Sequence, residues 1–378
     1  MIAHPASIPF APRALAPVLE FQAAATAPAA TLLFVVGATH RTAPLALRER
    51  LALKAEAEAR LAGEMARIAG LREFVILATC NRLELYGVAH HPSVLDAAEH
   101  ALAAGCGVSR AEFAQVRQCR QGRDAVRHLL EVAAGLDSQM LGETEIFGQV
   151  KRAYAAAQSR DSAGPALNRI FQKVFQGAKH VRTHTAITVG QVSVANVAVD
   201  LALKIFGDLQ SARVLLLGAG EIGEKTARAF ASRGARALSV ANRHRERADA
   251  LAAGLSASSL DFAEREARLG EFDIVVSATA ALGTVVSAAA ARAALRVRPA
   301  RPMLLVDLAL PRDIEPAAAE IPNVFLYNLD DLARIAEDNR AARAAEIAKC
   351  QGLVAARADA IWRQAEAPSA GNRAALAS

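Results

Sequence analysis

The chain has 378 residues, of which 53% are hydrophobic and 22% charged, and it carries a formal net charge of +6. This composition excludes a globally disordered chain, and the length predicts two or three domains. The mild basic excess, without a block of lysine and arginine, is compatible with an anionic cofactor or RNA as a partner.

The cysteine pattern and the N-terminal residues together indicate in which cellular compartment we expect the protein. Cys80, Cys106, Cys119 and Cys350 form neither a CxxC pair nor a ligand cluster with histidine, so we expect reduced thiols and no metal site. Residues 21–39 are too weakly apolar for a membrane span, and the first 12 residues lack the lysine or arginine of a signal peptide. We therefore interpret residues 1–30 as a flexible leader and expect a cytoplasmic protein without a membrane segment.

Residues 31–184 are predicted to form a small α/β domain. An apolar strand is expected at 31–37, followed by a helix from Thr42, whose hydroxyl can cap it, to about Ala69. Apolar spacing predicts further helices at 93–104, 109–117, 122–135, 143–159 and 165–183.

Two more strands of this domain are predicted at 73–79 and 82–88, with a very short connection between them. Cys80 and Asn81 lie between them, which predicts a tight turn or kink at a strand end. In the second strand apolar and polar residues alternate, as they do in a strand with one face in solvent.

Residues 185–329 are predicted to form a Rossmann-like domain with a parallel sheet. A connecting helix is expected at 187–206. Short apolar strands then alternate with helical stretches, at 214–220, 237–243, 272–279 and 303–309.

A long C-terminal helix is predicted at 330–366, within a final segment of 330–378. Its apolar positions are too sparse for it to fold alone, so we expect it to pack on another domain or another subunit. Beyond Pro368 the chain is predicted to be disordered.

A glycine motif predicts a dinucleotide site. Gly218, Gly220 and Gly223 have GxGxxG spacing, and they follow a predicted strand and open a predicted helix. This arrangement permits a tight turn, a close approach of backbone to a pyrophosphate, and a helix N-terminus that favours phosphate.

The second strand of this domain favours NADP over NAD. NAD sites usually place a carboxylate there for the ribose hydroxyl, whereas arginine suits the 2′-phosphate of NADP. Here Asn242 is followed by Arg243 and Arg245, with no acid before Glu246.

Cys80 has polar neighbours, which is unusual for a structural cysteine. Thr79, Asn81 and Arg82 surround it, whereas a buried free cysteine normally packs as a small hydrophobe. A reactive cysteine beside a nicotinamide predicts thioester chemistry, with Arg82 lowering the thiol pKa or binding a substrate carboxylate.

An ordered set of motifs in residues 31–345 resembles the glutamyl-tRNA reductase family, which begins tetrapyrrole synthesis. The motifs are GATHRTAPLALRERL (37–51), TCNRLELY (79–86), GLDSQMLGETEIFGQVKRAY (135–154), FQKVFQGAKHVRT (171–183), LLLGAGEIG (215–223), ANRHRERA (241–248), VSATA (276–280) and LLVDLALPRDIEP (304–316). The resemblance implies an N-terminal catalytic domain, an NADPH-binding domain and a spinal helix that leads to a dimerisation region.

The resemblance also implies a mechanism and a set of site residues. Cys80 would attack glutamyl-tRNA and release the tRNA, and NADPH would then yield glutamate-1-semialdehyde. His128 matches a histidine important for activity, and Arg82 would bind the glutamate carboxylate. Other implied substrate contacts are Thr79, Asn81, Ser138, Glu143, Thr144, Glu145 and Gln149. The implied cofactor contacts are Gly218, Ala219, Gly220, Glu221, Ile222, Gly223, Asn242 and Arg243.

Several of these residues have a structural alternative. Ser138 and Gln149 could satisfy helix ends, and His128 could be a packed helix residue. The face with Lys173, Lys179 and Arg182 could contact tRNA phosphates or be an ordinary solvated helix face.

Two departures from the family pattern affect the expectations. Glu145 stands where the family usually has glutamine, so its carboxylate could repel the substrate. The dimerisation helices are not present in this sequence, so we expect a monomer or a weak homodimer. The unstable aldehyde makes channelling to a glutamate-1-semialdehyde aminotransferase plausible.

Two other functions remain open from the sequence. A non-catalytic paralogue that kept the fold is motivated by Glu145 and the short C-terminus, and opposed by the intact Cys80 and Arg82. A reductase of a small acyl ester or shikimate-like substrate is opposed by the ordered N-terminal motifs.

Overall fold

The computed structural model describes residues 32–143, 145–187, 193–337 and 344–366. The predicted leader, the predicted disordered tail and Thr144 therefore lie outside the described residues.

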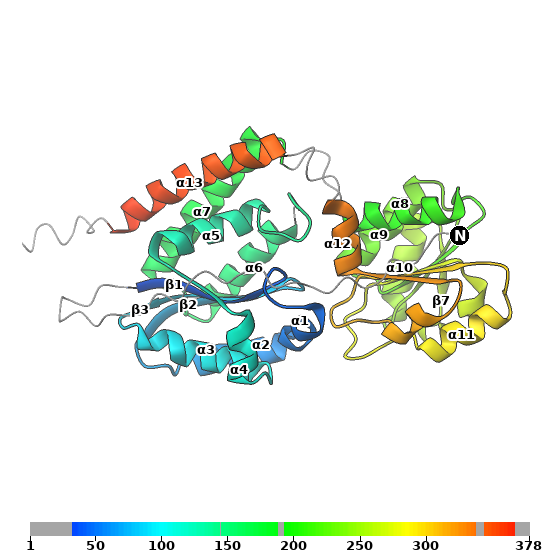
Figure 1. Cartoon of the computed structure of the whole chain (residues 1–378), viewed down its shortest axis with the longest axis horizontal. Helices are drawn as coiled ribbons and strands as arrows, with labels where there is room; N and C mark the ends of the chain where they lie inside the picture. The colour runs from blue at the N-terminus through cyan, green and yellow to red at the C-terminus, as the bar shows by residue number, and fades with distance from the viewer. Residues whose placement is uncertain (1–31, 144, 188–192, 338–343, 367–378) are drawn as a thin grey trace, which may run out of the picture. The chain divides into compact units, whose positions relative to one another are not determined.

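A four-stranded antiparallel sheet forms the first part of the structure (Figure 1). Its order is β2-β3-β1-β4. The strands are β1 (Leu32–Thr39), β2 (Leu71–Ala78), β3 (Arg82–Ala89) and β4 (Gln118–Gln121). The first three confirm the predicted strands. The sequence of β4, QCRQ, has no hydrophobic alternation and forms a strand because it pairs with β1.

Helices cover both faces of this sheet, as Figure 1 shows. One face packs against α2 (Ala55–Met65), α3 (Ser93–Gly105) and α4 (Arg110–Val116). The other packs against α5 (Gly122–Ala134), α6 (Glu145–Ser159), α7 (Pro165–His184) and α13 (Ala344–Glu366). The helices predicted for this part of the chain are confirmed, with ends that differ by a few residues.

The prediction that 82–88 is half exposed was wrong. Every residue of β3 is buried, because β3 lies between β2 and β1 and helices cover both of its faces. Leu83 and Leu85 pack against the α2–α4 side. Glu84 and Tyr86 alternate with them and reach the α5 side, where a hydrogen bond joins Tyr86 Oη to Glu84 at 2.7 Å.

The single helix predicted from Thr42 to Ala69 is also wrong. The chain forms α1 (Leu45–Leu51) and α2, separated by extended backbone at Ala52. The Thr42 hydroxyl does not cap α1, and instead bonds the backbone of Thr39. The break lets Leu51 of α1 reach the same hydrophobic cluster as the apolar face of α2.

The second sheet has six parallel strands in the order β10-β9-β8-β5-β6-β7. This is the strand order of dinucleotide-binding folds. The strands are β5 (Arg213–Leu217), β6 (Ala237–Ala241), β7 (Ser258–Leu260), β8 (Ile274–Ser277), β9 (Met303–Asp307) and β10 (Val324–Asn328). The predicted parallel sheet is confirmed. The two edge strands, β7 and β10, were not predicted because they are short and partly polar.

Helices also cover both faces of the parallel sheet. One cluster packs α8 (Val194–Phe206), α9 (Glu221–Ser232), α10 (Arg245–Leu255) and α12 (Leu329–Glu337) against it. The other face holds α11 (Ala288–Arg296) with the short 3₁₀ turns η1 (Phe262–Glu264), η2 (Leu269–Glu271) and η3 (Pro316–Glu320). The predicted connecting helix corresponds to α8, and residues 188–192 of that prediction lie outside the described residues.

The C-terminal helix is described as α12 and α13, on either side of residues 338–343, which lie outside the described residues. Cys350, Val354 and Ala358 of α13 are fully buried against the cluster of α5 and α7. The expectation that this sparse helix packs on another domain is therefore confirmed.

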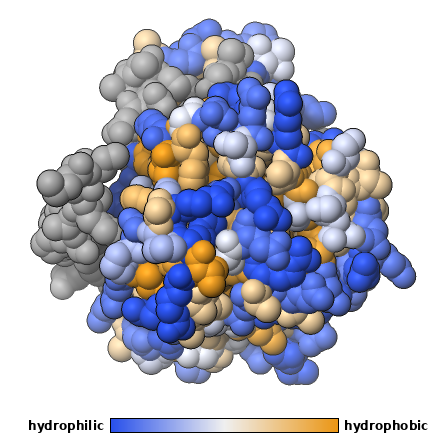
Figure 2. Space-filling model, turned by 90° about the vertical axis from the view of Figure 1, so that its right-hand side faces the viewer, coloured by the Kyte–Doolittle hydropathy of each residue, from blue (hydrophilic) through white to orange (hydrophobic). Residues whose placement is uncertain are grey.

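The surface of the described residues is mixed in character. Figure 2 shows one face, on which hydrophilic and hydrophobic residues are interspersed, as on ordinary protein surfaces. Among the described helices, none is long and apolar enough to cross a membrane.

Candidate active site

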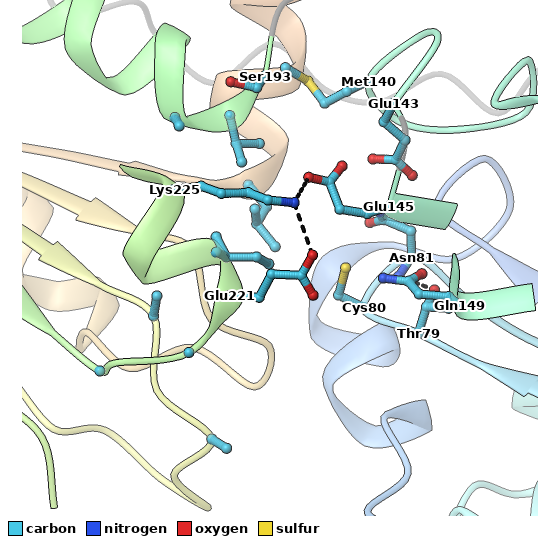
Figure 3. A pocket seen from close by; sticks show the side chains of 18 of the residues that line it. Thr79, Cys80, Asn81, Met140, Glu143, Glu145, Gln149, Ser193, Glu221 and Lys225 are labelled. Carbon is cyan, nitrogen blue, oxygen red and sulfur yellow. Dashed lines mark hydrogen bonds and ion pairs between the residues drawn. The ribbon is translucent and has the colours of Figure 1, made fainter. Parts of the chain in front are cut away.

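The cysteine turn and the glycine loop line one cavity of about 670 Å³. Figure 3 shows Cys80 on one side of it and Glu221 and Lys225 on the other. The cavity gathers most of the predicted site residues: Thr79, Cys80, Asn81, Arg82, Glu143, Glu145, Gln149, Gly218, Ala219, Gly220, Glu221, Ile222 and Asn242. Two segments more than a hundred residues apart in the sequence therefore share one site.

Cys80 stands at the tip of the β2–β3 hairpin, as predicted. Thr79 closes the turn, because its Oγ1 accepts from the backbone N of Asn81 at 3.1 Å and of Arg82 at 3.2 Å. The backbone N of Thr79 also donates to the Arg82 carbonyl at 2.9 Å. This local network holds the thiol at the cavity in a half-buried position.

The thiol of Cys80 is not activated by its surroundings. Burial raises its pKa to about 11, and Glu143 adds to the rise, whereas Arg48 and Arg82 lower it by less. Arg82 thus lowers the thiol pKa, as one of the two expected roles required, but burial outweighs this effect. At neutral pH the thiol is protonated, so its reaction needs a group that accepts the proton.

Glu143 is a carboxyl group that could accept this proton. It lines the same cavity, and burial raises its pKa to about 7, with a further rise from Glu145. A group with a pKa near neutrality can exchange protons at the pH of the cell.

Arg82 is clamped by two carboxylates. Its Nη1 donates to Glu84 at 3.2 Å and to Asp137 at 3.1 Å, and its Nη2 donates to the Asp137 carbonyl. In the part of the chain that the structure describes, Arg82 Nε is buried without a hydrogen-bond partner. The guanidinium is thus fixed at the cavity wall, and its Nε donor is not used by these bonds.

Glu84 organises this cluster, although the sequence analysis did not select it. It is fully buried and accepts from His128 Nε2 at 2.6 Å, from Gln118 at 2.9 Å and from Arg82. Burial alone would raise the pKa of Glu84, but His128 and Arg82 lower it well below its ordinary value. In the sequence, Glu84 alternates with Leu83 and Leu85, and this pattern predicts a solvent-exposed glutamate. The pattern therefore gave no sign that Glu84 is buried and binds Arg82 and His128.

His128 does not line the cavity. It is 1% exposed on α5 and stacks against Tyr86, with ring centroids 6.4 Å apart. The structure thus places His128 behind Arg82 and Glu84 rather than beside Cys80. A direct catalytic contact is not formed here, and the alternative of a packed histidine fits its position better.

Other predicted residues also lie away from the cavity lining. Ser138 is buried, and Arg243 is exposed at the end of β6. Gly223 packs inside the glycine loop, where an added Cβ would lie 2.6 Å from the Gly218 carbonyl oxygen. Thr144 lies outside the described residues.

The glycine loop has the shape that a dinucleotide requires. Gly218 has φ +101°, and a Cβ there would lie 2.4 Å from the Ala278 carbonyl oxygen, so only glycine fits. Gly220 precedes α9 without a side-chain cap, and nothing lies within 4 Å of a Cβ added to it. The helix N-terminus therefore presents unpaired amide donors at the cavity, which suit a pyrophosphate.

Glu145 is neutralised from the other side of the cavity. Lys225 Nζ lies 2.6 Å from Glu145 and 2.9 Å from Glu221, as Figure 3 shows. Sequence reasoning missed Lys225, although its place one turn into the helix after the glycine loop was a usable signal. Arg247 and the loop 278–280, which belong to two of the quoted motifs but were given no role, line the cavity too.

The chain is similar to known proteins over most of its length. Residues 36–185 match the family described as glutamyl-tRNA(Glu) reductase, N-terminal domain, and residues 200–335 match the shikimate / quinate 5-dehydrogenase family. The glutamyl-tRNA reductase of Pseudomonas aeruginosa is 41% identical over 322 residues, which cover 84% of this chain and 75% of the relative.

This chain belongs to the glutamyl-tRNA reductase family. A second relative, the glutamyl-tRNA reductase of Syntrophotalea carbinolica, is 39% identical over 321 residues, covering 85% of this chain and 72% of the relative. Among solved structures, the glutamyl-tRNA reductase of Methanopyrus kandleri has a TM-score of 0.48 and 35% identity, covering 88% of this chain and 80% of that one. The family resemblance that the motifs indicated is thus confirmed.

Proposed function

We propose that this chain reduces glutamyl-tRNA to glutamate-1-semialdehyde, the first step of tetrapyrrole synthesis. The observation that carries the proposal is the shared cavity, in which Cys80 faces the glycine loop. In the proposed reaction, the Cys80 sulfur attacks the ester carbonyl, the ester C–O bond breaks, and the tRNA leaves with its hydroxyl restored. A bound NADPH would supply the hydride to the carbonyl carbon of the resulting thioester; the C–S bond would then break, and Cys80 would leave and regain its proton as the aldehyde forms.

The residues of the cavity support distinct roles in this reaction. Glu143 would accept the thiol proton, because it lines the same cavity as Cys80 and its pKa of about 7 lets it exchange protons at the pH of the cell. Arg82 would bind the glutamate carboxylate, because its guanidinium is fixed at the wall with Nε unpaired in the described structure. Asn81 and Gln149 line the cavity as further substrate contacts.

His128 and Ser138 are proposed to act indirectly. His128 would hold Glu84, which in turn holds Arg82. Ser138 precedes Gln139, whose amide donates to Asp330 at 2.6 Å. These two residues would thus support the cavity wall rather than contact the substrate.

We propose NADPH rather than NADH as the reductant. Asn242 lines the cavity and its Oδ1 accepts from the backbone N of Ala219 at 3.3 Å, so the end of β6 lies at the glycine loop. Arg247 lines the cavity as well, and Arg243 is exposed two residues after the end of β6. The segment that follows β6 carries arginines and no acidic residue before Glu246. Such a segment suits the 2′-phosphate of NADPH, because arginine attracts the phosphate and no carboxylate repels it.

The domain roles and partners remain proposals. Residues 31–184 would bind the substrate and 185–329 the cofactor. Lys173, Lys179 and Arg182 lie on α7, where they could contact tRNA phosphates. Transfer of the aldehyde to a glutamate-1-semialdehyde aminotransferase is proposed on chemical grounds alone, because the aldehyde is unstable.

Incubation with glutamyl-tRNA and NADPH tests the function. Three products are measured: deacylated tRNA, oxidised cofactor and the aldehyde. Equal amounts of all three are expected. Release of tRNA without aldehyde, in the presence of NADPH, would contradict the proposed reduction.

A further inference from the structure

Glu49 and Arg312 form an ion pair with three hydrogen bonds. Glu49 Oε1 accepts from the backbone N and the Nε of Arg312, and Oε2 accepts from Nη2, each at 2.8 Å. The Arg312 side chain is 28% exposed and that of Glu49 17%. A two-pronged pair of this kind is directional, and partial burial limits its screening by solvent, so it fixes geometry better than an exposed pair.

Glu49 is the neighbour in sequence of the residue that holds the cysteine turn. Arg48 is 4% exposed, and its Nη1 donates to Asn81 Oδ1 at 3.1 Å and to the Cys80 carbonyl at 3.4 Å. Both residues are on α1. A shift of Glu49 therefore also shifts α1 and, through Arg48, the turn that carries Cys80.

Arg312 is the neighbour in sequence of the residue that holds a loop of the cofactor sheet. Asp313 is fully buried and accepts from Thr279 N and Ser277 Oγ at 2.7 Å and from Thr279 Oγ1 at 2.6 Å. Thr279 lines the cavity, and its loop packs against Gly218. Arg312 is thus tied to the part of the cavity opposite Cys80.

We propose that the Glu49–Arg312 ion pair is a positioning device that sets the Cys80 turn against the 277–280 loop of the cofactor site. The inference deepens the proposed function and rests on it. Reduction of a thioester on Cys80 requires the cysteine turn and the cofactor loop to keep a defined relative position. A displacement of the reacting groups by about 1 Å can lower the rate roughly a hundredfold. Acylation of Cys80 needs only the turn and its own domain.

The ion pair should therefore affect the two half-reactions differently. Without the pair, acylation of Cys80 and release of tRNA continue, because Arg48 and Thr79 still hold the turn. Reduction slows, because the loop held by Asp313 loses its direct tie to α1, and the ion pair of Arg48 with Asp330 of α12 does not replace that tie to the loop. A residue that only stabilises the fold would slow both half-reactions together.

Charge reversal and charge exchange test the proposal. Glu49→Arg and Arg312→Glu are compared with the double variant that carries both changes. The first readout is the labelling of Cys80 by iodoacetamide, measured by peptide mass with and without NADPH. We expect NADPH to protect Cys80 in the wild type and in the double variant, and the protection to be lost in each single variant.

The second readout separates the half-reactions. Without NADPH, the single-turnover release of tRNA should stay within about twofold of wild type; with NADPH, aldehyde formation should fall about tenfold or more and recover in the double variant. Glu58→Arg is the matched control, because Glu58 on α2 pairs with Arg160, the residue after α6, at 3.2 Å, and both lie in the part of the chain that holds the first sheet. It should change neither readout.

Two results would overturn the proposal. One is unchanged protection of Cys80 and unchanged reduction in both single variants. The other is an equal loss of tRNA release and of aldehyde formation, without recovery in the double variant. A wild-type protein that releases no tRNA would instead contradict the proposed function, and the labelling readout would still test the ion pair alone.

Discussion

Lys225 on α9 and Glu145 on α6 face each other across the cavity, with 2.6 Å between Nζ and Oε1. The sequence suggested that the Glu145 carboxylate would repel an anionic substrate. Burial alone would lower the pKa of Lys225, but its hydrogen bonds to Glu145 and Glu221 raise it. The lysine is therefore charged and compensates for the glutamate.

The first prediction concerns this pair. Lys225→Met leaves Glu145 as an unpaired carboxylate in the cavity, so the KM for glutamyl-tRNA should rise by roughly three- to tenfold. Adding Glu145→Gln should remove most of this increase. Arg228→Met, which removes an exposed cation of the same helix, is the control and should leave KM unchanged. An identical KM in Lys225→Met and in the double variant would show that Glu145 is not the cause.

The second prediction concerns the nucleophile. Cys80→Ser should abolish tRNA release and aldehyde formation, a loss of roughly a thousandfold or more, because serine lacks thiolate nucleophilicity. NADPH affinity, measured by fluorescence titration, should change less than about twofold, since the loss of one sulfur atom removes no charge. Cys119→Ser is the control, because Cys119 is not among the cavity residues. Wild-type rates in Cys80→Ser would remove the thiol from the mechanism.

The third prediction concerns cofactor choice. Arg247→Ala should weaken NADPH binding by about 1–3 kcal/mol and NADH binding by much less, because the 2′-phosphate loses a charge-assisted contact. Arg243→Ala should have a smaller effect in the same direction, since Arg243 does not line the cavity. Arg245→Ala, which removes an exposed partner of Asp249, serves as the reference. Equal losses for NADPH and NADH would show that neither arginine reads the phosphate.

The fourth prediction concerns pH and stability. Burial raises the pKa of Glu143 to about 7 and that of Asp307 to about 7, from ordinary values of 4.5 and 3.8. A carboxyl group with a raised folded pKa contributes stability below its unfolded pKa, and this contribution is lost as the pH rises through about 7. Glu143→Gln should therefore stabilise the protein at pH 8.5 by of order 1–3 kcal/mol, with little effect at pH 4.5.

Thermal unfolding of the wild type and Glu143→Gln at both pH values measures this effect. Asp307→Asn is less informative, because Asp307 also accepts from the backbone N of Ala309 and Ile314. Glu56→Gln is the control, since Glu56 is exposed on α2. The same difference in midpoint at the two pH values would mean that folding does not raise the pKa of Glu143.

Local signals in the sequence were sufficient for the glycine loop and the cysteine turn. Gly218 and Gly223 stand where backbone geometry permits no side chain, and Thr79 closes its turn with residues that are next to it. Interactions between near neighbours depend little on the rest of the fold. For the same reason the apolar strands of both sheets could be predicted from their own residues.

The environment of Glu84 could not be predicted in this way. Alternation in β3 predicts one solvent face, but α5 and α7 cover that face and bury Glu84 with His128. The burial of Glu84 depends on which helices pack against β3. Its partner His128 lies on such a helix, 44 residues further along the chain, so the residues near Glu84 in the sequence do not reveal it. His128 accordingly lies beside Glu84, behind Arg82, and not among the residues that line the cavity.

The charges across the cavity depend on tertiary structure as well. Glu145 pairs with a lysine 80 residues away and Glu49 with an arginine 263 residues away. The sequence determined that a thiol and a dinucleotide loop exist in this chain. The packing of the two sheets decided which carboxylates are neutralised and that burial raises the Cys80 pKa, because desolvation and charge pairing act through space rather than along the chain.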